Sequence, residues 1–222
     1  MTKQNHTTRL LFRPREKQSD KILLVYRNIL RGQKKLSYDL NEDYVEEIRI
    51  DRLTEENFNV YSLDSFIRHQ VVTECWRKVD GQWIILPIAF VEEWDLDKCR
   101  EEAYAIANNL HGKMIDYGAY KGEDLLGYIT VGTERIGTEK QYVQLVSFQV
   151  SEPYRGIGVG RKLFDKAVET AREYGAKKLY ISAHSSKESQ AAYNAFGCVH
   201  ATEIISWIAD EEPCDVQLEY VL

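Results

Sequence analysis

One stretch decides the fold of this 222-residue chain: Val150-Ser151-Glu152-Pro153-Tyr154-Arg155-Gly156-Ile157-Gly158-Val159-Gly160-Arg161. An apolar strand ends at Val150, Pro153 prevents further strand pairing, and three glycines open a helix. Because glycine has no Cβ, the backbone N–H groups of such a turn can converge on an anion, and the helix N-terminus adds partial positive charge. Arg155 and Arg161 add mobile positive charge. The sequence therefore predicts a pyrophosphate-binding turn.

Two widespread phosphate-binding motifs do not fit this turn. The motif G-x-x-x-x-G-K-[ST] is absent from the chain. The dinucleotide motif G-x-G-x-x-G fails because its sixth position is Arg161 when counted from Gly156 and Leu163 when counted from Gly158. That motif also belongs to an early strand of a doubly wound sheet, whereas this turn lies two thirds along the chain. The turn could instead be a plain connection that binds no ligand. In that case the glycines would destabilise the start of the helix and bring no functional gain.

The elements around the turn predict a mixed α/β sheet. A strand over Tyr142 to Val150 precedes a helix from Gly158 to Tyr174, and Leu179 to Ala183 and Lys187 to Phe196 repeat that strand–helix order. This order predicts a parallel strand pair. Elsewhere the pattern predicts a strand through Val45, Ile48 and Ile50, a short helix at 62–68, a hairpin of 73–79 and 82–88 around Asp80-Gly81, a helix capped by Asp95 or Asp97, a hairpin of 114–120 and 125–131, and closing strands at 200–205 and 216–221.

The glycine turn and the second helix together resemble one known family. Arg155-x-x-Gly158-x-Gly160 matches the [RQ]-x-x-G-x-[GA] signature of the GNAT superfamily of acyl-CoA-dependent N-acyltransferases, and Ser189 to Cys198 resembles its A-x-x-x-Y-x-x-x-G-F pattern. The resemblance extends from about Tyr117 to Val221. It implies a GNAT-like fold with a mostly antiparallel central sheet and flanking helices. The strand before the turn would splay from its parallel neighbour, and the pantetheine of acetyl-CoA would lie in the gap.

The resemblance also implies roles for individual residues. Phe148, Gln149 and Val150 would offer backbone groups to the pantetheine and the thioester, and Tyr193 would be the general acid that protonates the departing thiolate. Ser186 stands where many members have an asparagine that contacts coenzyme A. The pyrophosphate would be held by Arg155, Gly156, Ile157, Gly158, Val159, Gly160 and Arg161. No metal is implied.

The general base stays unassigned. Ile181 stands where ribosomal-protein N-terminal acetyltransferases have a glutamate, which argues against that subgroup. The possible bases are Glu74, Glu139 and Glu219, each of which also fits a surface or strand-edge position. We interpret His111 and His184 as structural, while Gln144 and Ser147 could point into the acceptor cleft. The acidic segment Asp210-Glu211-Glu212 fits a solvated loop that could attract a cationic acceptor.

Charge is unevenly distributed along the chain. Residues 1–35 hold ten Lys or Arg and two acids, a net charge of +8, which leaves −14 for the remainder because the total is −6. We expect residues 1–40 to form a basic helical extension and residues 41–222 to form the GNAT-like domain. Within this extension, apolar residues recur at helical spacing: Ile22, Val25, Tyr26, Ile29 and Leu30. We expect this apolar stripe to dock on the acidic domain, in the same chain or across a homodimer. The acidic domain argues against nucleic acid as the main partner.

Other sequence features indicate in which compartment of the cell we expect the protein. We expect no membrane span, because no stretch approaches about 18 apolar residues. The polar start shows no secretory signal, and the four cysteines form no C-x-x-C pair, so we expect a cytoplasmic protein with reduced thiols. The predicted activity is transfer of an acetyl group from acetyl-CoA to a primary amine of a small molecule or protein, by direct attack in a ternary complex. The alternative is a non-catalytic acyl-CoA-binding sensor or structural module with the same fold.

Overall fold

The computed structural model describes residues 48–222, so the predicted basic extension 1–40 lies outside the described residues, as does Val45 of the first predicted strand. The elements are β1 (Arg49–Arg52), β2 (His69–Val79), β3 (Gln82–Glu93), α3 (Leu96–Asn109), β4 (Met114–Lys121), β5 (Asp124–Ile136), β6 (Tyr142–Val150), the 3-10 helix η1 (Glu152–Tyr154), α4 (Val159–Glu173), β7 (Lys178–Ala183), α5 (Lys187–Phe196), β8 (Val199–His200), α6 (Ser206–Ala209) and β9 (Val216–Val221).

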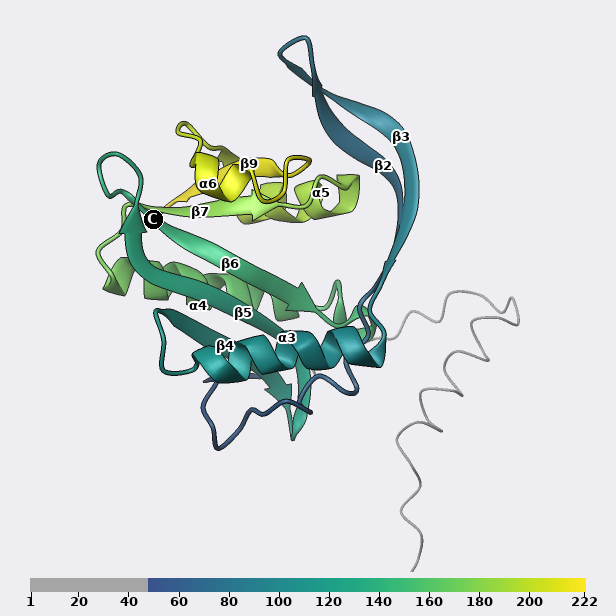
Figure 1. The fold of residues 1–222 in the computed structure, drawn as a ribbon, viewed down its shortest axis with the longest axis vertical. Helices are drawn as coiled ribbons and strands as arrows, with labels where there is room; N and C mark the ends of the chain where they lie inside the picture. Colours follow the sequence, from purple (N-terminus) through teal and green to yellow (C-terminus); the bar gives the residue numbers. More distant parts are fainter. Residues whose placement is uncertain (1–47) are drawn as a thin grey trace, which may run out of the picture. The chain divides into compact units, whose positions relative to one another are not determined.

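A seven-stranded sheet with the order β1-β4-β5-β6-β7-β9-β8 forms the centre of residues 48–222. Its neighbours are antiparallel except β6 and β7, which run parallel. Helices α3 and α4 lie on opposite faces of the sheet (Figure 1). The α4 face buries residues such as Leu163 and Phe164, whereas α3 buries Cys99 and Ala103 in a separate apolar cluster. The predicted mixed α/β fold with one parallel pair is confirmed.

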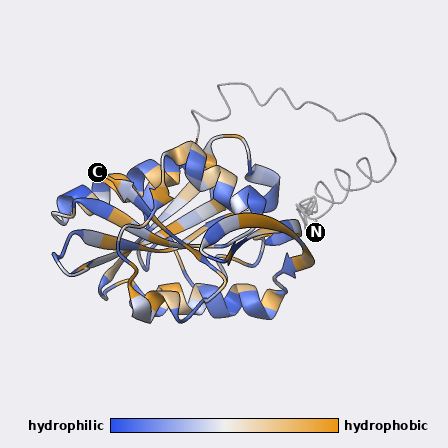
Figure 2. Ribbon diagram, turned by 90° about the horizontal axis from the view of Figure 1, so that it is seen from above, coloured by the Kyte–Doolittle hydropathy of each residue, from blue (hydrophilic) through white to orange (hydrophobic). Residues whose placement is uncertain are grey.

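Hydropathy explains why these segments pack in layers. Hydrophobic and hydrophilic residues alternate along both the strands and the helices (Figure 2). Along α4 the buried positions follow helical spacing, so one face of the helix meets the sheet and the other meets solvent. Gly158 begins this helix and Gly175 follows it, as the sequence predicts, and both have positive φ.

A bulge at Val146 opens the middle of the sheet. Opposite β5, the register passes from Leu145 to Ser147 and leaves Val146 without a partner. The parallel pairing of β6 with β7 ends at the same place, at Leu145 and Ile181. Beyond it, Ser147 to Val150 pair only with β5, and Ser182 and Ala183 pair only with β9. The two strands therefore diverge toward the glycine turn, as the family resemblance implies.

The hairpin of β2 and β3 stands apart from the main sheet and projects beyond it (Figure 1). It turns at Asp80-Gly81, as predicted, and both residues have positive φ, 49° and 81°, which fits a two-residue type I′ turn. Both strands are longer than the sequence predicts. One isolated bridge joins the hairpin to the chain after β7, where Trp76 N donates to Ser185 O at 2.8 Å.

Two predicted elements are wrong. The segment 62–68 is a series of turns rather than a helix, because Leu63 and Phe66 are both anchored in the apolar cluster under α3 and the backbone bonds reach only three residues back. The predicted strand 200–205 ends at His200. Ile205 N donates to the buried Tyr180 hydroxyl at 3.0 Å instead of to a neighbouring strand, and α6 begins directly after it.

Glu219 sits in a buried polar network that gives a stability prediction. Its carboxylate is 3% exposed and accepts hydrogen bonds from Tyr142 Oη at 2.6 Å, Lys178 Nζ at 2.7 Å and Thr202 N at 3.0 Å. Burial acts to raise the pKa of Glu219, but these bonds outweigh it and lower the pKa to about 2. Glu219 is therefore a charged structural residue and not a catalytic base.

We expect Glu219→Gln to lower the free energy of unfolding at pH 7 by roughly 3 kcal/mol, because it leaves the Lys178 ammonium without its buried partner. A lowered pKa in the folded state contributes stability above the unfolded pKa near 4.5, and this contribution is lost as pH falls toward 2. The difference between the proteins should therefore shrink in acid. Urea denaturation at pH 7 and pH 3 measures this. Glu134→Gln, at an exposed pair with Lys113, is the control and should leave the stability nearly unchanged, because water screens such a pair. Equal losses for the two variants would contradict the prediction.

Candidate active site

A cleft of about 840 Å³ lies where β6 and β7 diverge. One part is lined by the end of β6, the glycine turn and the face of α5 that carries Ser189, Ala192, Tyr193 and Phe196. The other part is lined by the base of the hairpin, the end of β7 and the loop before β9. The cleft thus joins the predicted cofactor-binding elements to a second wall, which includes Glu212 of the acidic loop that the sequence analysis singled out.

The glycine turn has the backbone shape that a pyrophosphate site requires. Gly156 and Gly158 have φ of 78° and 92°, which side-chain-bearing residues rarely adopt, and Gly158 caps α4. The first N–H groups of α4 have no partner within the helix, so they are available to an anion. A Cβ on Gly160 would lie 3.3 Å from Phe148 Cζ, so the helix approaches β6 closely there. Ile157 and Val159 pack their side chains into the core, which leaves only their backbone for a ligand.

The two arginines of the turn are held by backbone carbonyls. Arg155 Nε donates to Val150 O at 3.0 Å, and its Nη1 donates to His69 O at 2.8 Å. Arg161 Nη2 donates to Ala195 O at 2.7 Å, and its guanidinium lies 4.5 Å from the centroid of the Phe196 ring. The expectation of freely mobile charge is therefore wrong for both residues. They still line the cleft and bring fixed positive charge to it.

The strand residues predicted to face the pantetheine also line the cleft. Phe148, Gln149 and Val150 pair with β5 on one edge, while their other edge has lost β7. An open strand edge offers unpaired backbone groups to an extended ligand. Because the Val150 carbonyl already accepts from Arg155, the free groups of this edge lie nearer the bulge.

Tyr193 faces the cleft from α5, and its ring is half-buried. The ring meets Phe148 and Phe196 edge-on, with centroids 6.2 and 6.3 Å away. Burial, and to a smaller extent the charges of Cys198 and Asp215, raise the pKa of the phenol above its ordinary value. The phenol is therefore protonated at neutral pH, the state that a general acid needs.

Ser186 lies elsewhere than the resemblance implies. It is fully buried and is absent from the cleft lining, where Ser189 lies instead. Its hydroxyl caps α5 by accepting from Ser189 N at 3.2 Å and also accepts from Gln70 Nε2 at 3.0 Å. Because its side chain is enclosed and bonded, we leave Ser186 out of the proposed cofactor contacts.

Sequence reasoning missed a closed ring of hydrogen bonds beside the cleft. Arg68 Nη1 donates to Gln70 Oε1, Gln70 donates to Ser186 Oγ, and Ser186 N donates to His184 Nδ1, at 3.2, 3.0 and 3.2 Å. His184 Nε2 lies 3.2 Å from Glu92 Oε1, and Arg68 Nη2 bonds the other oxygen of Glu92. The ring ties the hairpin to the β7–α5 connection, two segments more than 90 residues apart whose contact no local pattern reveals.

The three glutamates that the sequence offers as possible bases lie away from the cleft. Glu74 pairs with Lys187, Glu139 is exposed, and Glu219 is in its buried network. His111 lies on the surface beside Glu55 and does not line the cleft. It therefore takes no part in the core packing. Of Gln144 and Ser147, the two β6 residues considered for the acceptor side, Ser147 lines the cleft and Gln144 does not. The carboxylates that line it are Glu92, Glu188, Glu212 and Asp215.

Comparison with known proteins now decides the family. The family model described as Acetyltransferase (GNAT) family matches residues 73–198, more than half of the chain. The chain belongs to the GNAT acetyltransferase family. Comparison with curated protein sequences found no significant match. The GNAT match begins inside the hairpin and ends just after α5, so it contains the bulge, the glycine turn and Tyr193.

Solved structures share the fold of this GNAT acetyltransferase at low sequence identity. A nourseothricin acetyltransferase is 16% identical, with a TM-score of 0.59, over 79% of this chain and 98% of the other. An acetyl-CoA complex named as a streptothricin acetyltransferase of Bacillus anthracis str. Ames is 16% identical, with a TM-score of 0.54, over 79% and 97%. A PaiA N-acetyltransferase of Thermoplasma acidophilum bound to coenzyme A is 14% identical, with a TM-score of 0.50, over 79% and 99%.

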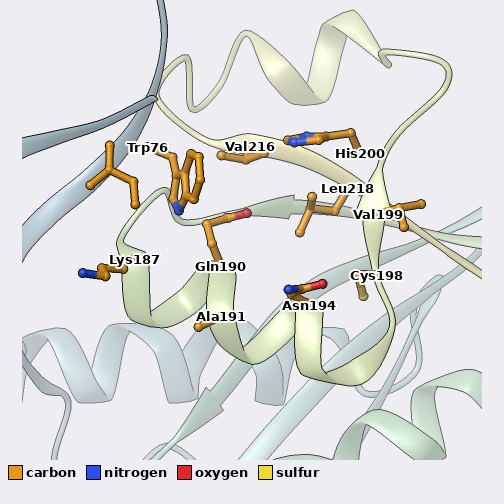
Figure 3. A pocket seen from close by; sticks show the side chains of 11 residues that line it. Trp76, Lys187, Gln190, Ala191, Asn194, Cys198, Val199, His200, Val216 and Leu218 are labelled. Atoms are coloured by element: carbon orange, nitrogen blue, oxygen red, sulfur yellow. The ribbon is translucent and has the colours of Figure 1, made fainter. Parts of the chain in front are cut away.

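The GNAT domain holds a second, smaller cavity of about 480 Å³ behind α5. Trp76 of the hairpin faces Gln190 and Asn194 of α5 across it, and Val216 and Leu218 of β9 form another side (Figure 3). Helix α5 therefore separates the two cavities, with Tyr193 on the cleft side. Between Ile48 and Leu222, no helix has both the length and the hydropathy that crossing a membrane requires.

Proposed function

We propose that this acetyltransferase transfers the acetyl group of acetyl-CoA to a primary amine on a cationic acceptor. The observation that carries the proposal is the negative charge on the lining of the cleft. Glu188, Glu212 and Asp215 line it, and none of them forms an ion pair with another residue of the described range 48–222. Unpaired carboxylates favour an ammonium group there.

The proposed binding of acetyl-CoA uses the groups that fit it. The N-terminus of α4 and the backbone of Gly156 to Arg161 suit the pyrophosphate, and the open edge of β6 near Phe148 and Gln149 suits the pantetheine. Acetyl-CoA supplies an activated thioester. The chain supplies alignment of the amine with that thioester, and Tyr193 supplies a proton to the departing sulfur.

One argument for the alternative, a non-catalytic acyl-CoA-binding module, is weakened by the position of Ile181. It relied on isoleucine at position 181, where a glutamate base occurs in one subgroup. Ile181 is 1% exposed and packs in the core on the α4 face, so its identity bears on packing rather than on an acceptor. Any base must come from another position, and the cleft carboxylates offer several.

Release of free coenzyme A tests the proposed function. Wild-type protein would be assayed at pH 8 with acetyl-CoA and amines that differ in charge: a polyamine, an aminoglycoside, and the similarly sized pair lysine and glutamate. We expect turnover with the cationic amines at kcat/KM at least tenfold above that for glutamate, and a decline with added salt. Binding of CoA without release for any amine would favour the non-catalytic module.

Two further parts of the proposal concern the setting. We propose that residues 1–40 are a basic extension of the acetyltransferase domain that docks on acidic protein surface, in the same chain or in a homodimer. We also propose that the protein acts in the cytoplasm. The cysteines support this, since Cys75, Cys99, Cys198 and Cys214 are all free thiols.

A further inference from the structure

Few groups in the cleft can accept a proton from an acceptor amine. Glu92 is bonded by both Arg68 and His184, and the His184 bond first and the Arg68 charge next hold its pKa near 2 against the effect of burial. Such a carboxylate is a very weak base. Glu188 and Glu212 are exposed, so solvent screens them and competes for the proton.

His184 is also unsuited to the task. The Ser186 N–H group points at Nδ1, so Nδ1 carries no proton, and the proton on Nε2 faces the Glu92 carboxylate. Both nitrogens of the neutral ring are therefore engaged. Taking another proton at Nδ1 would break the bond with Ser186 and open the ring that anchors the hairpin. His184 is a positioning residue of the cleft wall.

Asp215 has the position that the other groups lack. It is half-buried in the cleft, and its Oδ2 accepts from Ser182 Oγ at 3.3 Å. Ile181 and Ala183 face α4, and side chains alternate along a strand, so Ser182 lies on the opposite face of β7. Ser182 is also the first residue of β7 beyond the pairing with β6. Asp215 therefore lies beside the gap between β6 and β7, on the face of the sheet opposite to α4.

We propose that Asp215 is the catalytic base that removes a proton from the acceptor's ammonium group. This inference rests on the proposed function, because it needs an amine acceptor. The groups around Asp215 come from several elements: Ser182 and His184 from the β7 end, Glu92 from β3, Glu212 from its own loop and Tyr193 from α5. Burial raises the pKa of Asp215 to about 6, which makes it a stronger base than an ordinary carboxylate.

The proton and bond changes balance with groups that the chain holds. The ammonium proton passes to Asp215, and the free amine attacks the thioester carbonyl, forming the C–N bond. The C–S bond breaks, and Tyr193 gives its proton to the sulfur. The second amine proton then restores the Tyr193 phenol, and Asp215 releases its proton to solvent after product leaves. The sum is ammonium plus acetyl-CoA giving N-acetyl amine, coenzyme A and one proton.

The test is the pH profile of Asp215→Asn with an acceptor that wild-type protein acetylates. We expect kcat/KM at pH 7 to fall at least 100-fold, the lower part of the range for general base catalysis. The deficit should shrink steadily between pH 8 and pH 10, because the amine then loses its proton to solvent. Wild type should show an acidic limb with an apparent pKa near 6, and the variant should lack it.

Two matched variants separate catalysis from binding. Glu123→Gln changes an exposed carboxylate of the β4–β5 turn that does not line the cleft, and should leave kcat and KM unchanged. Glu212→Gln removes a cleft carboxylate and should raise KM with little change in kcat or in the pH profile. If Asp215→Asn behaves like Glu212→Gln, Asp215 binds the acceptor and is not the base.

A folding defect is distinguished by two further measurements. Because a raised pKa favours the protonated form in the folded state, the charge of Asp215 contributes no stability above pH 6, and Asp215→Asn should melt no lower than wild type at pH 7.5. Asp215→Ala should regain activity with added formate, which can occupy the vacated space as a base. Absence of both the pH-dependent recovery and formate rescue overturns the proposal. Absence of wild-type turnover with every amine overturns the proposed function itself.

Discussion

Gly158→Glu is expected to abolish binding of coenzyme A, with affinity reduced at least 100-fold. The φ of 92° at Gly158 disfavours any side chain, and a carboxylate at the start of α4 would place negative charge where the pyrophosphate should lie. A 100-fold loss corresponds to about 2.7 kcal/mol. Isothermal titration of the folded variant with CoA measures it.

Gly175→Glu is the matched control for this change. Gly175 follows the other end of the same helix, has a φ of 70°, and has only Arg135 Nη1 within 4 Å of an added Cβ. The two variants therefore introduce the same charge and similar backbone strain at opposite ends of α4. Gly175→Glu should keep CoA affinity within about threefold of wild type. Similar losses in both variants would mean that strain, and not the turn's contact with a phosphate, explains the result.

Tyr193→Phe should reduce kcat by about 100-fold and leave the affinity for CoA near the wild-type value. The substitution keeps the ring contacts with Phe148 and Phe196 and removes only the hydroxyl group, and with it the proton that the thiolate would receive. Steady-state kinetics with a confirmed acceptor, together with CoA titration, measure the two effects. The defect should lessen with an acyl donor whose leaving thiol is more acidic, because such a thiolate departs without help.

Tyr220→Phe provides the comparison for a packing role. Tyr220 also stacks edge-on against a phenylalanine, Phe164, but it does not line the cleft. Its kcat should stay within a factor of two of wild type. If Tyr193→Phe also stays within that factor, its hydroxyl takes no part in the reaction.

The parts of this site that sequence reasoning predicts are those that local residues determine. Glycine at positive φ and the turn at Asp80-Gly81 each follow from a few neighbouring residues, as does the helix cap, which the sequence places at Asp95 or Asp97 and the structure at Asp95. The strand β6, the glycine turn, and the helix α5 that carries Tyr193 therefore have bounds close to those that the sequence predicts. The helix predicted at 62–68 was wrong because Leu63 and Phe66 pack into the apolar cluster under α3 and do not form one face of a helix.

The parts that sequence reasoning missed depend on contacts between distant segments. Nothing in the alternating pattern of β6 marks Val146 as the bulged residue, because the bulge is defined by the register against β5. His184 was interpreted as structural without partners, and its partner Glu92 lies 92 positions earlier on a hairpin whose placement no pattern indicates. Asp215 was not considered, since its position in the cleft depends on Ser182 and on where β7 loses β6.

The attachment of the hairpin has a consequence for synthesis of the chain. Gln70 is bonded to Ser186, which is made 116 residues later. At about 5–20 residues per second, on the order of ten seconds separate the two on a ribosome. A hairpin with local contacts forms within microseconds, so it is complete long before its anchor exists. During that interval Trp76 and Ile85, which later line the cavity behind α5, have no partners from α5 or β9. These apolar side chains therefore stay exposed to solvent until α5 and β9 have been made.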